Sequence, residues 1–546
     1  MGLDNWMAVC LALIAVWILI SGLDDLFIDF VFFAWRSKPF PWPAEAELAQ
    51  AQQRRIAILV PLWHEHDVIE QMLRHNLSAL QYGNFDIFVG VYPNDPLTLE
   101  AVERVARDDP RVHVGVGTHD GPTSKGDCLN SAYQWMVEYE SRRGIDFEIL
   151  MTHDAEDLMH PDSLRLINWF SRDYQMVQIP VLPLPTRLRE WTHGLYCDEF
   201  AEFQLKDIPV RRQLGGFLPS NGVGTGFERS ALESLRRRHQ GRIFDPECLT
   251  EDYENGFRMH AAGHRQIFVP IRLRDGEPAA TREYFPRTWR AAIRQRSRWV
   301  AGITLQGWQY HGWRVPLLQA YWFWRDRKGL VGNLLSPVAN LLLLYWTAAC
   351  GLTSIGFAGT ALAHPLSHAP DWLQPVFALS AAISVIGTGV RVHLSARIYG
   401  GRFAAAAPLR VLWGNLINCC ATAQALHQFV TARIRRRSLT WRKTDHVYPG
   451  VAARGIPMRI RRRPRLGEVL VHLRLISTEE LERALLFKPK GQRIGEYLVR
   501  LNKITVIDLD QALSSQAGTV GVWVPEPVRH FRDAQAQHSP APSTTA

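Results

Sequence analysis

The chain has few cysteines, and none of them is arranged to bind zinc. The seven cysteines stand at positions 10, 128, 197, 248, 350, 419 and 420 and include no CxxC pair. This spacing predicts reduced thiols with structural roles. Residues 1–5 carry no basic side chain, and no small-x-small cleavage site follows the first apolar run. We therefore expect a retained membrane helix there and not a cleaved signal peptide.

A nucleic-acid-binding motif is also lacking, although the net charge is +9. Much of the surplus arginine lies in two short clusters, at residues 433–437 and 459–465. The first cluster follows an apolar stretch directly, as basic residues do on the cytoplasmic side of a membrane, so we expect no nucleic-acid partner. The length of 546 residues predicts two or more domains.

Three stretches meet or approach the about 20 apolar residues that a membrane helix needs. They are residues 6–33, 335–362 and 373–392. Asp24, Asp25 and Asp29 are costly inside a bilayer, so the first span is expected to end or bend near Ser21. A fourth stretch, residues 404–434, is interrupted by polar residues and favours an interfacial or re-entrant helix.

Basic residues follow the first span and flank the two later spans outside the loop at 363–372, which has none. The positive-inside rule then places both large soluble segments in the cytoplasm. Between residues 54 and 270, apolar strands alternate with helical segments, beginning with IAILVPLW, DIFVGVY, RVHVGVG and FEILMTHD. This alternation predicts an α/β domain around a mainly parallel sheet.

The C-terminal part of the chain contains an internal repeat. Residues 465–485 align without gaps on residues 493–513, at an offset of 28 residues. The repeat predicts a small helical duplication. Residues 534–546 have the composition of a disordered tail.

Polar residues gather where the predicted strands end, and ligands bind at that edge of a parallel sheet. Pro61 and Glu65 follow the first strand, and Asn94 and Asp95 follow the second. Each of them is equally expected as a turn or capping residue.

The fourth strand runs directly into Asp154, Glu156 and Asp157. Carboxylates so close together repel one another unless a cation lies between them, and oxygen ligands suit Mg²⁺ or Mn²⁺. The alternative is a helix cap with a solvated acidic turn.

Two later segments carry further candidates. Thr250, Glu251 and Asp252 stand at an expected helix start, where a carboxylate either caps the helix or faces a pocket. The run RQRSRW places Gln295, Arg298 and Trp299 on one helix face, where they could hold a diphosphate and a sugar ring. An ordinary buried tryptophan beside surface arginines is the other interpretation.

In this order, the segments resemble the catalytic domain of glycosyltransferase family 2, of the GT-A fold and the processive synthase type, over about residues 55–302. The family's aspartate-x-aspartate, TED and QxxRW motifs correspond here to DAED, Thr250–Asp252 and Gln295–Trp299. Glu156 stands where the family usually has aspartate, and YPNDP replaces a double aspartate.

The resemblance implies roles for single residues. Pro61, Glu65 and Asp95 would surround the uracil and Lys125 would lie near the diphosphate. Asp154 with Glu156 or Asp157 would hold the metal. Asp252 would be the general base beside Glu251, Trp299 would line the acceptor site, and Gln295 and Arg298 would steady the leaving diphosphate. The small-residue segment 222–227 would border the acceptor. Deprotonation of the acceptor by Asp252 implies one displacement with inversion.

Each C-terminal repeat opens with arginine, an aliphatic residue and glycine: Arg465, Leu466 and Gly467, then Arg493, Ile494 and Gly495. Glycine lets a ligand approach the backbone, and arginine can bind phosphate; a helical bundle that only buries leucine is the alternative. The segment resembles the MshE N-terminal domain, which binds cyclic di-GMP. Gln516 closes the second repeat as in that family, whereas Lys488, Arg474 and Asn502 depart from its pattern.

Together these parts resemble the phage-adsorption inner-membrane glycosyltransferases of Gram-negative bacteria. That family implies an N-acetylmannosamine polymer, an outer-membrane export partner and activation by cyclic di-GMP. Residues 441–449 could correspond to the gating segment of processive synthases.

The leading hypothesis is a polymerase that threads a growing glycan through its own membrane helices. Transfer of a single sugar to a lipid carrier and an inactive nucleotide-sensing scaffold are the alternatives. The expected domains are a membrane helix (1–34), the transferase (54–302), interfacial and membrane helices (303–434), a basic linker (435–462), the dinucleotide-binding domain (463–520) and the tail (534–546).

Overall fold

The computed structural model of the protein describes residues 3–35, 40–274, 277–355 and 372–437, residues 439 and 448, and residues 466–518 with gaps at 474, 478–479, 482–483, 486–487 and 489–491. The chain forms two compact units, Met1–Ile460 and Arg461–Ala546. The loop at 363–371, most of the expected gating segment, Arg465, Arg474 and the tail lie outside the described residues.

A seven-stranded sheet, in the order β3-β2-β1-β4-β7-β5-β8, forms the core of the α/β domain in the first unit. All neighbouring strands pair in parallel except β7, which is antiparallel to both β4 and β5. The prediction of a mainly parallel sheet is confirmed. The strands are β1 (Ile56–Pro61), β2 (Phe85–Val91), β3 (Val112–Val116), β4 (Ile149–Thr152), β5 (Met176–Gln178), β7 (Thr225–Glu228) and β8 (Gln266–Phe268).

Helices cover both faces of this sheet because each presents an apolar stripe to it. Apolar residues of α3 and α4 join one core cluster, and those of α5 and α9 join a second one. Ser124 caps α5, since its side chain accepts a hydrogen bond from the Asp127 backbone N–H. The helices are α2 (Glu45–Gln50), α3 (Ile69–Ala79), α4 (Pro96–Asp108), α5 (Lys125–Arg143), α6 (Ser163–Phe170), α9 (Arg229–Arg238) and α10 (Glu251–Ala261).

Short strands and helices complete the domain and lead out of it. They are β6 (Val181–Pro183), β9 (Leu273–Arg274), β10 (Glu277–Pro278), β11 (Thr281–Glu283), α7 (Trp191–Glu202), the π-helix η1 (Phe203–Asp207), α8 (Ile208–Gln213), α11 (Trp289–Trp299), the π-helix η2 (Val300–Gln306), α12 (Gly307–His311) and α13 (Leu317–Arg327). The parallel pair β11 and β6 brings residues near position 283 back to the main domain.

The remaining helices of the first unit are long. They are α1 (Leu3–Trp35), α14 (Gly329–Ser354), α15 (Leu373–Tyr399), the short α16 (Gly401–Ala404) and α17 (Ala407–Ile434). Among the residues that the structure describes, α15 alone is long and apolar enough to cross a membrane by length and composition. The other two expected spans stay predictions.

Helix α1 continues beyond Ser21 as one helix to Trp35. Its aspartates do not end it because cations from other elements meet them: Arg325 and Lys328 pair with Asp24, and Lys206 pairs with Asp29 at 2.6 Å. Burial of these charges is compensated pair by pair.

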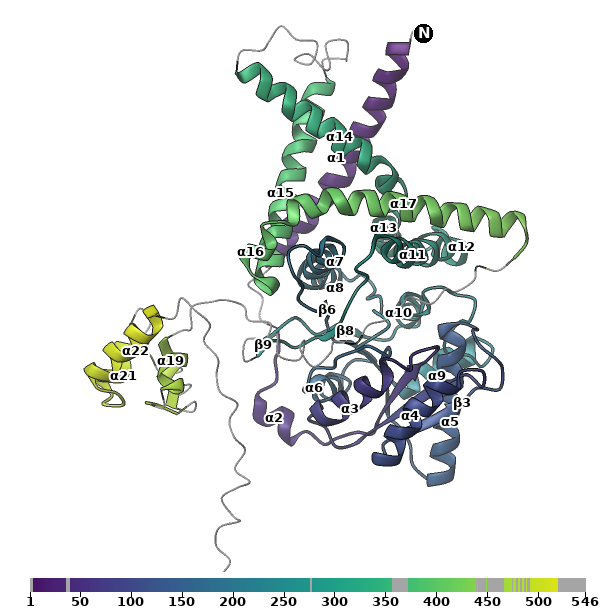
Figure 1. Ribbon diagram of the computed structural model, residues 1–546, viewed down its shortest axis with the longest axis vertical. Helices are drawn as coiled ribbons and strands as arrows, with labels where there is room; N and C mark the ends of the chain where they lie inside the picture. The colour runs from purple at the N-terminus through teal and green to yellow at the C-terminus, as the bar shows by residue number, and fades with distance from the viewer. Residues whose placement is uncertain are drawn as a thin grey trace, which may run out of the picture. The chain divides into compact units, whose positions relative to one another are not determined.

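Helix α17 is also unbroken (Figure 1). The polar residues that interrupt its apolar sequence contact neighbouring helices. Arg410 binds Asp198 of α7 at 2.6 and 2.9 Å, Asn415 binds Asn340 of α14 at 3.1 Å, and Asn418 accepts from Arg296 of α11 at 2.6 Å. These residues therefore fix α17 against the rest of the unit.

The second unit contains α19 (Leu466–His472), α21 (Ile494–Arg500) and α22 (Val506–Gly518) around a small apolar core. Its contacts recur at the 28-residue offset. Ser477 and Glu480 form a reciprocal cap, and Thr505 and Asp508 form the same cap in the second repeat.

Candidate active site

The acidic turn after β4 has an internal order. The Asp157 side chain is fully buried and accepts hydrogen bonds from the Asp154 backbone N–H at 2.9 Å and from His153 at 2.7 Å. Asp154 and Glu156 line the large cavity described below, whereas Asp157 is not among its lining residues. Asp157 therefore stabilises the turn without lining the cavity. Of the two alternatives for the second metal ligand, this geometry favours Glu156.

Lys125 lies at the start of α5 and meets this turn. Its Nζ is 2.6 Å from Asp154 Oδ1. Burial by itself would lower the pKa of Lys125, but the charges of Asp154, Glu251 and Asp252 raise it above its ordinary value. The lysine therefore stays cationic and binds together the two acidic segments of the site, although β4 and α10 are far apart in the sequence.

Helix α10 begins at Glu251, so the TED segment stands at a helix start as expected. The Asp252 carboxylate is tightly enclosed: a methyl group added at Gly222, whose φ is +77°, would lie 2.6 Å from Asp252 Oδ2. Burial raises the pKa of Asp252, and the charge of Lys125 opposes the rise. Burial, with repulsion from Asp252, raises the pKa of Glu251 to about 7.

Helix α11 brings the third segment to the same place. Gln295, Arg298 and Trp299 line the cavity together, as their shared helix face predicts. Gln295 Oε1 and Arg298 Nε are buried and have no hydrogen-bond partner among the described residues. Both atoms are therefore available to a ligand.

Between them, Arg296 points the other way and fixes the helix. It donates to the Glu199 carboxylate at 2.5 and 3.3 Å and lies 4.4 Å over the Tyr196 ring. Helix α11 continues directly into the π-helix η2. A methyl group added at Gly302 of η2 would lie 2.5 Å from Thr250 Oγ1. This close packing joins the QxxRW helix to the start of α10, and π-helical turns are frequent at functional sites.

One cavity of about 900 Å³ connects these residues. Its wall contains Lys125, Asp154, Asp252, Arg298 and Trp299, and it continues past the transferase domain between the long helices. In the far part, Ile383, Arg391 and Val411 line the cavity together with amide and hydroxyl side chains of α14, α15 and α17: Asn333, Ser336, Asn340, Ser384, Thr388, Asn415 and Asn418.

A small pocket of about 60 Å³ adjoins the cavity and shares Lys125, Asp154 and Arg298 with it. Pro61 and Glu65 line this pocket as expected. Asp95 does not: it is buried, caps α4 through the Thr98 backbone N–H and accepts from the His64 backbone N–H at 2.6 Å. Its contact with a base stays a prediction, and its observed contacts shape the loop that carries Glu65.

The sequence did not reveal three residues of the site. Trp63 and Tyr92 form the aromatic wall of the small pocket, with ring centroids 5.3 Å apart. Trp63 follows directly on a predicted strand end, which was the available signal. Glu283 lines the large cavity beside Asp154 and Glu156. No motif surrounds Glu283, and only the pairing of β11 with β6 places it there.

The acidic part of the cavity fits a divalent cation. Burial and then the charges of Asp157, Glu156 and Asp154 raise the pKa of Glu283 well above its ordinary value, so negative charge is in excess at this point. The described residues contain no group of three or more His, Cys, Asp or Glu side chains arranged to hold a metal by themselves. Mg²⁺ commonly takes only one or two carboxylates and completes its shell with phosphate and water, which this donor set permits.

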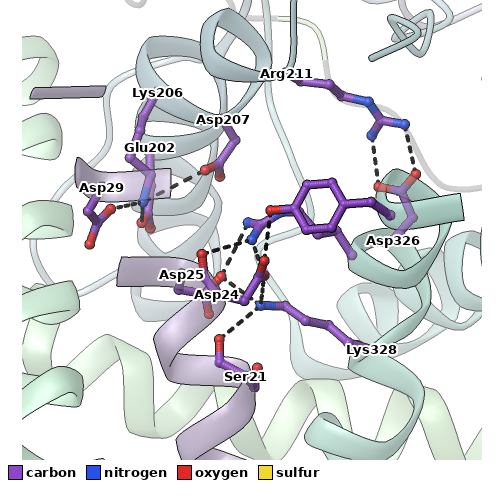
Figure 2. Close-up of polar contacts among 12 residues, drawn as sticks. Ser21, Asp24, Asp25, Asp29, Glu202, Lys206, Asp207, Arg211, Asp326 and Lys328 are labelled. Carbon is purple, nitrogen blue, oxygen red and sulfur yellow. Dashed lines mark hydrogen bonds and ion pairs between the residues drawn. The ribbon is translucent and has the colours of Figure 1, made fainter. Parts of the chain in front are cut away.

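A network of ion pairs forms another part of the cavity wall (Figure 2). Lys328 lies 2.9 Å from Asp24 and 2.7 Å from Asp25 of α1, and Lys206 lies 2.6 Å from Asp29 and 2.7 Å from Glu202. These pairs join α1 to η1 and α13.

A separate ion pair lies next to the catalytic segment. Arg211 forms two hydrogen bonds with Asp326, at 2.8 and 3.0 Å (Figure 2). The Tyr253 hydroxyl donates to the same carboxylate at 2.6 Å. Tyr253 is the neighbour of Asp252 on α10. The Arg211–Asp326 pair therefore supports the helix turn that presents the candidate base.

In the second unit, the spacing that the two repeats share places the glycine of each repeat against a leucine. A methyl group at Gly467 would lie 2.6 Å from Leu481, and one at Gly495 would lie 2.5 Å from Leu509, again 28 residues apart. Asn502 has φ +53°, a conformation that asparagine tolerates better than most residues. Arg465 and the side chain of Gln516 lie outside the described residues, whereas Arg493 lies directly before α21.

Comparisons with known proteins show the family of the chain. Residues 53–302 match the family model "Glycosyltransferase like family 2". The chain is 36% identical over 541 residues to bacteriophage adsorption protein B of Escherichia coli (strain K12), covering 92% of this chain and 70% of the relative. Bacteriophage N4 adsorption protein B of Escherichia coli O157:H7 matches with the same values.

Solved structures with low similarity include two glycosyltransferases. The Pyrobaculum calidifontis mannosyltransferase PcManGT, in complex with GDP-Man and Mn²⁺, has a TM-score of 0.43 at 18% identity and covers 74% of this chain and 99% of its own. Staphylococcus aureus TarS 1-349, in complex with UDP-GlcNAc, has a TM-score of 0.29 at 10% identity, over 69% and 92% of the two chains. The family assignment rests on the sequence matches: the chain is a glycosyltransferase with a family 2 domain and belongs to the bacteriophage adsorption protein B family.

Proposed function

We propose that the protein is an inverting, metal-dependent polymerase of the bacterial inner membrane, with its catalytic and C-terminal domains in the cytoplasm. It would take a UDP-N-acetylhexosamine, with UDP-N-acetylmannosamine as one candidate, and build a β-linked exopolysaccharide under the control of cyclic di-GMP. The observation that carries the proposal is the single cavity that joins Lys125, Asp154, Asp252 and Trp299 to the space between the long helices.

The donor would occupy the smaller pocket and the adjoining part of the cavity. Trp63 and Tyr92 offer aromatic edges and Glu65 a carboxylate to a flat base. Lys125 and Arg298 line both spaces and can each contact the diphosphate. Arginine binds phosphate oxygens in pairs through its planar donor fork, so the buried, unpartnered Nε of Arg298 is suited to this contact.

Asp252 would take the proton from the incoming hydroxyl. Burial raises its pKa toward the working pH, which makes it a stronger base than an exposed aspartate, while Lys125 keeps enough of it ionised. The acceptor sugar would stack on Trp299, and one in-line displacement would convert an α-linked donor into a β-glycoside.

Asp154 and Glu156 would hold Mg²⁺ or Mn²⁺ against the diphosphate. When bound, the ion would stabilise the negative charge that develops on the leaving UDP. Asp157 keeps Asp154 oriented through the backbone hydrogen bond, and Gln295 and Arg298 face the same space.

The growing glycan would leave through the far part of the cavity. Its lining of asparagine, serine and threonine side chains provides neutral hydrogen-bond donors and acceptors, which suit sugar hydroxyls and acetamido groups. Continuity with the acceptor site favours repeated addition over a single transfer. An outer-membrane export partner would receive the polymer.

The second unit would bind cyclic di-GMP through Arg465, Leu466 and Gly467 and through Arg493, Ile494, Gly495 and Gln516. The support is the duplicated sequence with its matching caps and glycine contacts. Each repeat could then offer one arginine to one half of a two-fold symmetric dinucleotide.

The test is release of UDP by the purified protein in detergent, with Mg²⁺ or Mn²⁺, from a panel of UDP-N-acetylhexosamines, with and without cyclic di-GMP. We expect release that EDTA abolishes and that the dinucleotide increases, with a long product on size-exclusion analysis. Products with one added sugar would support transfer to a lipid carrier. Dinucleotide binding without turnover of any nucleotide sugar would support the inactive scaffold.

A further inference from the structure

A second cavity, of about 520 Å³, lies at the C-terminal end of α17 and outside the catalytic site. Its wall contains Arg433, Arg436 and Arg437 from the end of α17, and Gln309 and Tyr310 from α12. The remaining lining residues are Glu247, Gln306, Phe429, Ala432 and Leu439. Three guanidinium groups thus face one carboxylate, and the cavity carries excess positive charge.

The three arginines form no ion pair or side-chain hydrogen bond with any other described residue. Several like charges at one cavity repel one another unless an anion lies among them. The negative end of the α17 dipole lies nearby and offsets only part of this repulsion. The cluster is therefore suited to a ligand that carries phosphate.

The two helices that line the cavity also carry exposed apolar and aromatic side chains. Ile434 is 77% exposed and Val430 51% on α17, and Trp308 is 45% exposed on α12. Nearby on the chain, Trp313 is 43% exposed and Leu317 90%. Tryptophan and tyrosine beside exposed aliphatic residues are typical of the membrane interface, where basic clusters meet anionic headgroups.

We propose that this cavity is a binding site for the headgroup of an anionic phospholipid. Arg433, Arg436 and Arg437 would bind the phosphate, and Tyr310 would border the headgroup. The exposed apolar residues of α17 and α12 would lie against the acyl chains. A soluble phosphate compound would use the arginines but would leave this apolar surface uncovered.

The site lies against the loop that leads to the catalytic base. Gln306 lines the cavity, and its side chain accepts a hydrogen bond from the Leu249 backbone N–H at 2.9 Å and donates to the Glu247 carbonyl at 3.0 Å. Residue 250 and the start of α10 follow directly. A bound headgroup would therefore order the loop at 245–250 from outside the active site.

The test uses the full-length protein in nanodiscs of phosphatidylcholine with and without phosphatidylglycerol, with bound lipid counted by native mass spectrometry. The double variant Arg436→Gln/Arg437→Gln is compared with Arg237→Gln/Arg238→Gln, which removes two exposed arginines from the last turn of α9. At about 1 kcal/mol for each basic residue at an anionic membrane, the first variant should bind phosphatidylglycerol about 30-fold more weakly. The control should bind it as the wild type does.

Two further measurements are competition by inorganic phosphate and amide hydrogen exchange. Millimolar inorganic phosphate should not displace the lipid, and phosphatidylglycerol should slow amide exchange at residues 245–250 in the wild type but not in the first variant. Equal lipid retention by both variants would overturn the proposal, and so would full displacement by inorganic phosphate. Since both substituted pairs are exposed, equal melting temperatures of the two variants would show that folding does not explain the difference.

Discussion

Replacing Gly222 with alanine should disable the candidate base while leaving the protein folded. The added methyl group would lie 2.6 Å from Asp252 Oδ2, and carbon atoms of this kind are not found closer than 3.0 Å to such neighbours. The carboxylate must therefore move by several tenths of an ångström. Because a misplacement of about 1 Å can cost about 100-fold in rate, we expect turnover to fall about 10- to 100-fold.

The same substitution also strains the backbone, because Gly222 has φ +77°. Alanine in this left-handed region costs about 1–2 kcal/mol. Gly263→Ala is the matched control: its φ is +83° and an added methyl group would meet no atom within 4 Å. Both variants should lose similar stability, and only Gly222→Ala should lose turnover.

The assay is the rate of UDP release at saturating donor, with unfolding by denaturant measured on the same preparations. Turnover of Gly222→Ala within twofold of Gly263→Ala would refute the reasoning. It would mean that Asp252 has room to move without consequence, or that it does not act in the reaction.

Three other predictions follow from the contacts described. Asp326→Asn leaves the buried Arg211 without its carboxylate and should destabilise the protein by about 3 kcal/mol in denaturant unfolding. The control Glu138→Gln removes one partner of an exposed ion pair and should cost less than about 1 kcal/mol. Equal losses of stability in the two variants would contradict this prediction. The rate of UDP release should fall on acidification at a pH above the range of an ordinary aspartate, because burial raises the pKa of Asp252 and only the ionised form accepts a proton; an acid limb near pH 4 would exclude Asp252 as the base. Gly495→Ala should overpack the second unit against Leu509 and cost about 1–3 kcal/mol, and a two-stage unfolding curve that leaves the second unit unchanged would show that its core is not as described.

The features that could be predicted from sequence are local ones. The end of β1 at Pro61, the end of β4 just before Asp154 and the helix start at Glu251 each depend on a few neighbouring residues. The shared face of Gln295, Arg298 and Trp299 follows from helix periodicity alone. These predictions therefore hold without knowledge of the tertiary structure.

Features that depend on distant partners could not be predicted in this way. Glu283 reaches the acidic turn only through a short strand pair, and β7 inserts antiparallel between β4 and β5. Asp157 looked equivalent to Glu156 in sequence, but its contacts with His153 and the Asp154 backbone separate the two.

The charged residues in the long helices also have partners that are distant in the sequence. Asp24 and Asp29 in α1 and Arg410 in α17 appeared as interruptions of apolar sequence. Each has an ion-pair partner from another element, and in the case of Arg410 the partner lies 212 residues away. Hydropathy measures single residues and so cannot detect such pairs.

The most direct test of the central claim compares donor binding with turnover in Asp252→Asn. UDP-sugar affinity is measured by calorimetry, and turnover is measured as UDP release at saturating donor. Glu251→Gln is measured in the same way for comparison. For Asp252→Asn we expect a donor affinity within a few-fold of the wild type. Its turnover should fall by about 100- to 10,000-fold, since general base catalysis contributes about that much. Wild-type turnover by Asp252→Asn would contradict the claim that this carboxylate is the base of the glycosyl transfer.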